Sequence, residues 1–333
     1  YSINITYIQT YFLILLYFIV IIYVRGFLMG RTGLFLTIST ILTMILFLFS
    51  HNSITLGDVS IYELGNVFIG TENEVSENYT QSIDLSDFNT VKKTFYAIDK
   101  KTGMPEDLFN IEEMSEANLH INIEGNGPKV LIFHTHGSER YADSKSDSDG
   151  IIGAGEYLKS ILEDKYGIEC LHITDKFDVV DGKLQRDGAY ERAEPVITQV
   201  IKENPSIQLV IDLHRDGVNE NLHLATTIDG KSYAKIMFFN GICRKWDNGN
   251  LVPTTGLENS YLKTNLALSF QMQCAVTSFN SSITRKIYIN AYRYSLHMKD
   301  KSMLIELGAQ TNTYEEALNS IEVIADALNK VCF

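Results

Sequence analysis

The sequence has little proline, few cysteines and no excess of basic residues, and each shortage excludes a class of protein. Five prolines in 333 residues, together with 45% hydrophobic residues, exclude collagen-like and disordered chains. The 28 lysines and arginines are outnumbered by 41 aspartates and glutamates, which gives a formal net charge of -13. A protein with this charge has no general basic surface to hold nucleic acid, so we expect no nucleic-acid partner.

The cysteines also exclude one kind of metal site. No two of them have the C-x-x-C spacing of a zinc site built from cysteines, and their positions leave the disulfide state open. They are Cys170, Cys243, Cys274 and Cys332.

Acidic residues and lysine are absent from the first 50 residues, where the only charges are Arg25 and Arg31. Residues 32–50 form an uncharged apolar run close to the roughly 20 residues that cross a membrane, and a second uncharged run covers 1–24. Both arginines lie between these runs, and the positive-inside rule places such a segment in the cytoplasm. We therefore expect a transmembrane helix at 32–50 that anchors the rest of the chain on the outer face of the cell membrane.

Residues 1–28 have two interpretations. The chain begins at Tyr1, and Met29 precedes the anchor like an ordinary start, so residues 1–28 are either upstream sequence or a second membrane span. Both interpretations give the same topology, either a single pass or a hairpin. A cleaved signal peptide is the rival, but residues 49–51 offer no Ala-x-Ala-like cleavage site.

The remainder of the chain divides into two parts. Residues 51–126 are polar and acidic with no clear repeat, and they predict a stalk or spacer. Residues 127–333 alternate short apolar runs with helical patterns, which predicts a catalytic domain of α/β class with a mainly parallel sheet flanked by helices. Ligands bind such sheets beyond the carboxyl ends of the strands.

The expected elements follow from hydrophobic periodicity and helix caps. Strands are expected at 129–133, 167–171, 207–213, 222–228, 235–239 and 302–305, and helices at 153–166, 189–204, 258–274 and from the capping residue Thr313 to 329, with a short helix near 86–97.

Three of these strands end in residues suited to metal chemistry. His136 and Glu139 follow the first strand with H-x-x-E spacing, and His214 lies at the end of the most apolar strand. Two histidines and a carboxylate are a common ligand set for catalytic zinc, so we expect Zn²⁺ at this edge. Glu306, at the end of the late strand, is the natural general base.

Other residues near these strand ends leave alternatives open. Glu156, in the first turn of a predicted helix, is an alternative acidic ligand to Glu139. Arg215 is placed to bind a substrate carboxylate or an oxyanion, or instead to pair with a neighbouring aspartate, Asp212 or Asp216. His134 is expected to contact the substrate or to support a ligand.

Three motifs resemble the stage II sporulation protein P family, which are membrane-anchored cell-wall hydrolases of endospore-forming bacteria. The motifs are His-Thr-His-Gly-Ser-Glu at 134–139, Ile-Asp-Leu-His-Arg-Asp-Gly at 211–217 and Leu-Ile-Glu-Leu-Gly-Ala-Gln-Thr-Asn-Thr at 304–313. The resemblance covers roughly 128–329, with weaker echoes at 190–192 and 294–297.

The resemblance implies a fold similar to zinc amidases and carboxypeptidases. It matches His136 and His214 to the histidine ligands of the wider amidase group and Glu306 to the second carboxylate of that group. For the acidic ligand, the carboxypeptidase arrangement selects Glu139, which we prefer, and the amidase arrangement selects Glu156.

The resemblance also implies an activity. The enzyme would be an N-acetylmuramoyl-L-alanine amidase that cleaves the amide between N-acetylmuramic acid and L-alanine in peptidoglycan. It would act at the sporulation septum and the engulfing membrane, with a partner similar to stage II sporulation protein D. Two rival functions remain, a zinc endopeptidase that cuts peptidoglycan crosslinks and a non-catalytic ectodomain that binds the wall.

Overall fold

The computed structural model describes residues 87–333. The expected anchor at 32–50, residues 1–28 and the first part of the expected stalk therefore lie outside the described residues. Within 87–333, no helix has both the length and the apolar character needed to cross a membrane.

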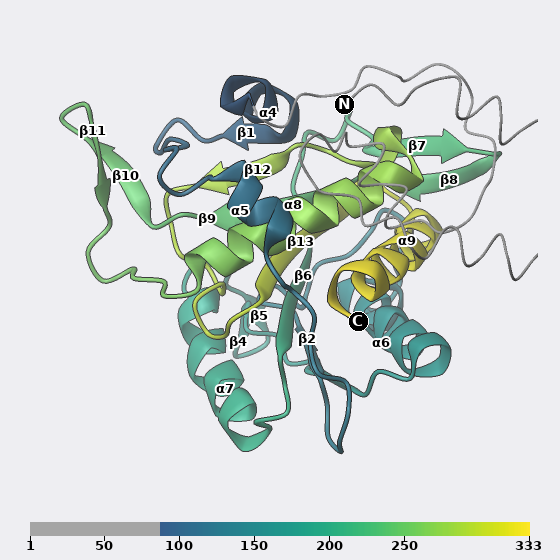
Figure 1. Cartoon of the computed structure of the whole chain (residues 1–333). Coiled ribbons are helices and arrows are strands. Elements are labelled where there is room, and N and C mark those ends of the chain that lie inside the picture. Colours follow the sequence, from purple (N-terminus) through teal and green to yellow (C-terminus); the bar gives the residue numbers. More distant parts are fainter. Residues whose placement is uncertain (1–86) are drawn as a thin grey trace, which may run out of the picture. The chain divides into compact units, whose positions relative to one another are not determined.

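A seven-stranded sheet forms the centre of this part of the chain, in the order β1-β12-β9-β13-β6-β2-β3 (Figure 1). Neighbouring strands are parallel except β9 and β13, which pair antiparallel. The predicted α/β class with a mainly parallel sheet is thus confirmed. The strands are β1 (Tyr96–Ile98), β2 (Val130–Phe133), β3 (Cys170–His172), β6 (Leu209–Asp216), β9 (Ile236–Gly241), β12 (Ile287–Asn290) and β13 (Ser302–Ala309).

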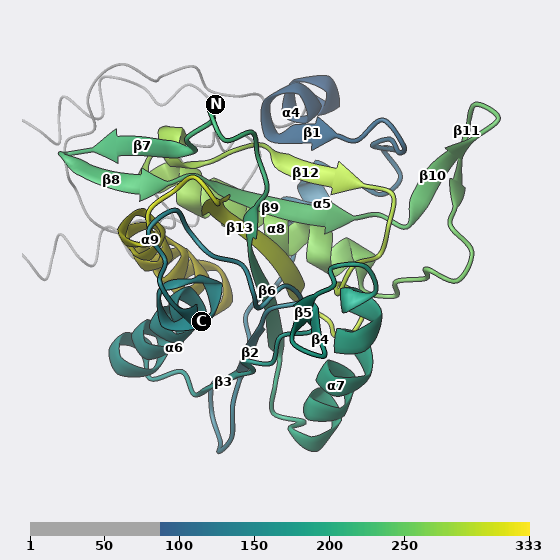
Figure 2. The ribbon, with the colours of Figure 1, turned by 180° about the vertical axis from the view of Figure 1, so that it is seen from behind.

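Helices cover the two faces of the sheet unequally (Figures 1 and 2). The alternation of side chains along β2 and β6 separates two apolar clusters. Ile132 and Ile211 belong to the large core formed with α6 (Ile151–Tyr166), α8 (Leu262–Phe279) and α9 (Tyr314–Cys332). Leu131 and Val210 belong to a much smaller core with α7 (Ala189–Glu203). The face that α7 covers is therefore the thinner side of the protein.

Local sequence signals account for most of these elements. Thr313 and Glu316 form the capping box that begins α9, as expected. Gly167, with a left-handed φ of 69°, ends α6. The apolar run from Leu209 to Leu213 is buried on both faces of the sheet, as central parallel strands require.

Three two-stranded antiparallel hairpins lie outside the main sheet. The expected strand at 222–228 forms one of these hairpins and not a central strand, because Asp229 and Gly230 both have positive φ and turn the chain back on itself. The β10–β11 hairpin projects away from the sheet in Figures 1 and 2. The hairpins are β4 (Val179–Val180) with β5 (Lys183–Leu184), β7 (Ala225–Ile228) with β8 (Lys231–Ala234), and β10 (Arg244–Asp247) with β11 (Asn250–Pro253).

The folded part includes residues that the sequence assigned to a stalk. Strand β1 pairs with β12 in the central sheet, and α4 (Phe88–Phe95) and α5 (Ile111–Glu116) supply buried side chains to the large core. The side-chain amide of Gln271 in α8 donates to backbone carbonyls at 114, 115 and 117. The expected boundary at residue 127 is therefore wrong for 87–126. The short helix expected near 86–97 is α4, but the other apolar residues of this segment are too irregularly spaced to be recognised along the chain.

Candidate active site

The strands β2, β6 and β13 are adjacent and parallel, so their carboxyl ends meet at one edge of the sheet. Phe133 pairs with Asp212, and His214 pairs with Glu306. This register brings the three motifs of the sequence to one place.

The three expected ligands lie together at this edge. The rings of His136 and His214 have centroids 5.3 Å apart, and Glu139 Oε2 lies 3.7 Å from His214 Nδ1. The Glu139 carboxylate also accepts hydrogen bonds from the Arg186 guanidinium at 3.1 Å and the Arg215 backbone N–H at 3.0 Å. Glu139 is therefore fixed beside His214 by two further donors, and Arg186 is a site residue that the sequence did not reveal.

Glu156 and His134 belong to a separate, neighbouring chain of contacts. Glu156 bonds to His172 Nδ1 at 2.8 Å, and His172 Nε2 lies 2.9 Å from His134 Nε2. His134 Nδ1 contacts the Leu213 carbonyl at 2.7 Å. The side chain of His134 has no exposed surface. The expected substrate contact by His134 is therefore wrong in this structure, where the residue supports the strand end that carries His214.

The Asp212 carboxylate accepts several hydrogen bonds close to His136 and His214. Its carboxylate accepts from the backbone N–H of Thr135 at 2.9 Å and from the hydroxyls of Thr135 and Ser295, both at 2.7 Å. His214 Nε2 lies 2.7 Å from Asp212 Oδ1, in a close contact that lacks hydrogen-bond alignment. Burial raises the pKa of Asp212, but the His214 charge and these bonds outweigh it and bring the pKa to about 2. Asp212 is therefore a fixed negative charge against His214.

Glu306 is the carboxylate best placed for proton transfer. Its Oε2 is buried and has no hydrogen-bond partner among the described residues. Burial raises the pKa of Glu306 to about 8, with the charges of Glu139 and Asp216 adding to the effect and His214 and Arg285 opposing it. A carboxyl group with such a pKa can both accept and return a proton near neutral pH.

His136 supplies a second buried atom without a partner. Its Nδ1 makes no hydrogen bond, and the nearest carboxylate oxygen, in Asp178, lies 3.9 Å away. Burial lowers the pKa of His136 to about 4, and the charges of His214 and Arg186 act in the same direction. The ring is therefore neutral at neutral pH, which is the form that binds metal ions.

The fit to a metal ion can be tested on these atoms. Within residues 87–333, no three His, Cys, Asp or Glu side chains are arranged closely enough to hold one. Two of the expected ligands nevertheless have a buried ring nitrogen without a hydrogen-bond partner among the described residues, His136 Nδ1 and His214 Nε2, and such atoms are donors of the kind that zinc satisfies. The donor chemistry fits Zn²⁺, and the ion pair of Glu139 with Arg186 is the contact that competes with it.

Arg215 does not form the expected alternative pair with a neighbouring aspartate side chain. Its Nε donates to the Arg140 carbonyl at 3.0 Å, and its guanidinium lies 4.0 Å from Glu139. Asp216 pairs with Arg285 at 2.8 Å, so neither neighbouring aspartate side chain is its partner. The Arg215 side chain is 14% exposed, which leaves a small part of it open toward the solvent.

Tyrosines that the sequence left without a role lie against the histidines. The Tyr190 ring packs edge-on against His136 at 5.6 Å and stacks beside His214 at 6.4 Å. Tyr294 packs against Tyr190 at 5.3 Å. Both tyrosines, and Ser295, lie in the two segments with weaker resemblance to the family, 190–192 and 294–297. That resemblance was the one sequence signal that could have identified them.

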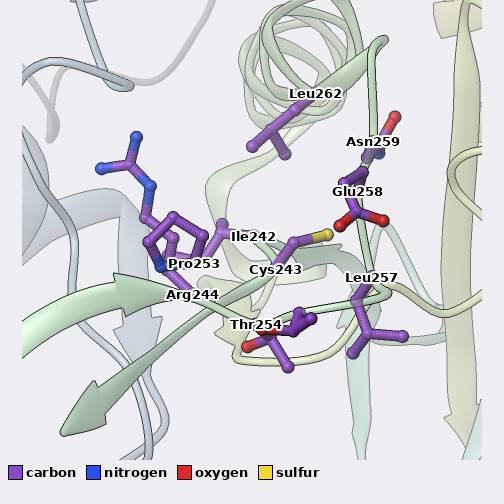
Figure 3. Close-up of a pocket in the computed structure, with 10 residues that line it drawn as sticks. Ile242, Cys243, Arg244, Pro253, Thr254, Leu257, Glu258, Asn259 and Leu262 are labelled. Carbon is purple, nitrogen blue, oxygen red and sulfur yellow. The ribbon is translucent and has the colours of Figure 1, made fainter.

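A separate cavity of about 270 Å³ lies between the end of β9 and the start of α8 (Figure 3). Cys243 and Glu258 line it, and the Cys243 sulfur points toward the Glu258 carboxylate. None of the strand-end residues lines this cavity.

Comparison with known proteins gives one family and several distant structures. The family described as Stage II sporulation protein P (SpoIIP) matches residues 61–329. The curated Stage II sporulation protein P of Bacillus subtilis (strain 168) is 24% identical over 222 residues, which are 62% of this chain and 52% of that protein. The chain thus spans about half the length of this relative.

Solved structures with some likeness share little sequence with the chain. The N-acetylmuramyl-L-alanine amidase Ami1 from Mycobacterium abscessus has 10% identity and a TM-score of 0.38, over 61% of this chain and 98% of that one. The CwlD amidase from Clostridioides difficile, solved in complex with the GerS lipoprotein, has 14% identity and a TM-score of 0.36, over 61% of this chain and 98% of that one.

Proposed function

The chain belongs to the stage II sporulation protein P family, and from that membership and the cluster of strand-end residues we propose that it hydrolyses peptidoglycan during sporulation. The bond we propose is the amide between N-acetylmuramic acid and L-alanine. The observation that carries the proposal is the buried, unpaired Oε2 of Glu306, on the residue that pairs with His214, whose ring in turn lies 5.3 Å from that of His136.

Zinc is the cofactor that we propose for this site. His136, His214 and Glu139 would hold it, and the metal would supply Lewis-acid polarisation of the scissile carbonyl and a more acidic bound water. Glu139 is preferred to Glu156 because it lies 3.7 Å from His214, whereas Glu156 is bonded to His172.

The protein's own residues would then divide the work. Glu306 would take a proton during attack on the amide and return it to the leaving amine, which is typically worth about 10²–10⁴ in rate. Asp212 would hold the orientation of the His214 ring, as carboxylates beside ligating histidines do. Arg186 and Arg215 fix Glu139, and the exposed part of Arg215 offers positive charge to a substrate carboxylate or a developing oxyanion.

The decisive test is digestion of purified peptidoglycan by the full chain in detergent, followed by identification of the new termini. We expect released stem peptides with a free L-alanine amino group, glycan strands that stay unbroken and carry free lactyl carboxylates, and loss of both products with a chelator. Glu306→Gln should lower the rate by roughly 10²–10⁴-fold. The matched variant Glu156→Gln should leave most of the rate intact. Equal activity of Glu306→Gln and the unaltered chain would contradict the proposal.

The same digest separates the rival functions. New amino groups from crosslinking residues, in place of L-alanine, would indicate an endopeptidase that uses the same metal and base. Sedimentation of the chain with peptidoglycan, without any new termini, would indicate a wall-binding ectodomain.

Location and partner are further parts of the proposal. The uncharged run at 32–50 supports a membrane anchor, with the body on the outer face at the sporulation septum and the engulfing membrane. A wall hydrolase similar to stage II sporulation protein D would be the partner. Crosslinking in sporulating cells, followed by identification of the attached protein, tests this part.

A further inference from the structure

A row of five aromatic rings extends from the proposed catalytic residues across the sheet. Tyr190 packs against Tyr294 at 5.3 Å, Tyr294 against Phe239 at 4.7 Å, and Phe239 against Tyr288 at 5.1 Å. Tyr292 lies 6.2 Å from Tyr294 at an interplanar angle of 90°. We call these five residues the aromatic row.

The register of the strands places the aromatic row on the same face as the catalytic residues. Tyr288 pairs with Phe239, and Phe239 pairs with Leu304. Glu306 lies two residues beyond Leu304 in β13 and pairs with His214. Because side chains two apart in a strand share a face, the row and the site lie side by side on the face that α7 covers only in part.

The turn that carries two of the rings is built at a conformational cost. Tyr294 has a φ of 53°, in the left-handed region that non-glycine residues rarely adopt. A Cβ on Gly241 would lie 2.2 Å from the Tyr292 carbonyl oxygen and 2.8 Å from the Tyr294 ring. Only glycine at 241 therefore leaves room for this turn, and the turn holds Tyr294 between Phe239 and Tyr190.

The outer end of the row is open and carries polar groups at its rim. Tyr292 is 46% exposed. Lys101 Nζ lies 3.4 Å from the Tyr292 hydroxyl and 5.2 Å from its ring centre. The Tyr288 hydroxyl donates to Asp99 at 2.8 Å. The rim thus combines one cation and one anion, so it has no net charge to attract a charged peptide.

We propose that the aromatic row binds the glycan portion of the substrate. Sugar rings offer flat C–H faces ringed by hydroxyls, and tyrosines match them with an apolar ring and a polar hydroxyl. A sugar face would stack on the exposed ring of Tyr292, which Tyr294 and Tyr190 hold in line with the site, and the sugar hydroxyls would bond to the Tyr292 hydroxyl, Lys101 and Asp99. This inference rests on the proposed function, since a glycan next to Glu306 is the substrate of that reaction.

The test measures binding of peptide-free N-acetylglucosamine oligomers to the full chain in detergent by isothermal titration calorimetry. All forms carry Glu306→Gln, so that nothing is hydrolysed. We expect Tyr292→Ala to weaken binding by roughly 5–50-fold, as loss of a stacking ring does. Tyr292→Phe keeps the ring and should retain most of the affinity. Tyr261→Ala removes another exposed tyrosine, outside the row and 38% exposed, and should have no effect.

Three results would overturn the proposal: no binding of the oligomers, equal binding by Tyr292→Ala, or equal loss with Tyr261→Ala. A fourth is binding of a free stem peptide that falls with Tyr292→Ala while the oligomers bind unchanged. Hydrolysis with Glu306 intact separates this inference from the proposed function. If Tyr292→Ala releases L-alanine termini with an unchanged KM, only the proposal that the aromatic row binds glycan is refuted. If oligomer binding depends on Tyr292 but no hydrolysis is found, only the proposed hydrolase activity is refuted.

Discussion

Asp212 shows how one residue organises the site. It accepts three hydrogen bonds, from two atoms of Thr135 and from Ser295, while it lies against His214. These partners come from the segment after β2, from β6 and from the segment before β13. A substitution at Asp212 should therefore disturb the carboxyl ends of both β2 and β6.

We predict that Asp212→Asn destabilises the fold and lowers activity. The amide group presents N–H where the carboxylate accepts, so at least one buried donor, either the Thr135 backbone N–H or the Thr135 and Ser295 hydroxyls, loses its acceptor. The free energy of unfolding should fall by about 1–3 kcal/mol in urea titrations. Asp216→Asn, which breaks only the partly exposed pair with Arg285, should cost less than about 1 kcal/mol. Equal losses in the two variants would contradict this account.

Glu316 gives a pH prediction away from the site. Burial would raise its pKa, but hydrogen bonds from His223, Asn312, Ser232 and the Thr313 backbone outweigh it and lower the pKa. The stability that Glu316 contributes is thus present above its unfolded pKa, about 4.3, and is lost as the pH falls through the lowered folded value.

Glu316→Gln should therefore lower the free energy of unfolding at pH 7 by about 1 kcal/mol, as loss of a helix cap does. The free energies of unfolding of Glu316→Gln and of the unaltered chain should become more alike as the pH is lowered below about 4. Urea unfolding at several pH values measures it. Glu315→Gln, exposed in the same turn, is the control, and a gap that widens in acid would refute the argument.

At the scale of elements, the close approach of α6 to the strand ends positions the histidine contacts. A Cβ on Gly155 would lie 2.7 Å from His134 Nε2 and 2.8 Å from His172 Nε2. Glycine at this helical position costs helix propensity, and here it allows α6 to pack directly on the two rings. The helix thereby supports the Leu213 carbonyl, next to His214.

We predict that Gly155→Ala destabilises the protein although alanine favours helices. Overpacking typically costs about 1–3 kcal/mol, which exceeds the gain in helix propensity of about 1 kcal/mol at most sites. Thermal unfolding measures the net loss. Adding His172→Ala removes one of the clashing rings, so the cost of Gly155→Ala should shrink in that background. A cost that is the same in both backgrounds would show that the rings do not cause it.

At the scale of the whole chain, charge and location are linked. A net charge of -13 gives no bulk attraction to an anionic wall polymer. The proposed anchor would replace that attraction by confining the enzyme near its substrate, where tethering raises effective concentration by factors of 10² or more.

We therefore predict that a form lacking residues 1–50 digests isolated peptidoglycan in solution and fails in the sporulating cell. Rates on purified wall should be close to those of the full chain, while wall degradation in cells should fall by about 10²-fold. Fusing an unrelated single-span anchor to the truncated form should restore function. Full activity of the truncated form in cells would show that the anchor is dispensable.

The sequence predicted the elements whose signals are local. The capping box and apolar stripe identify α9, the continuous apolar run identifies β6, and the metal-type residues stand directly after predicted strands. These elements could be predicted because hydrophobic periodicity, helix caps and adjacent residues are all properties of one short segment of sequence. The strand alternation also gave the fold class, and with it the convergence of three motifs on one edge.

Tertiary structure alone decided the partners of these residues. Glu139 rather than Glu156 faces His214, His134 turns into the protein, β1 joins the sheet from what looked like a stalk, and the aromatic row forms from three separate segments. Each of these is a contact between residues far apart in the chain. Such contacts depend on the register of the strands, on the packing of α6 against the sheet and on the space that glycines leave for neighbouring side chains. No local sequence pattern predicts these features.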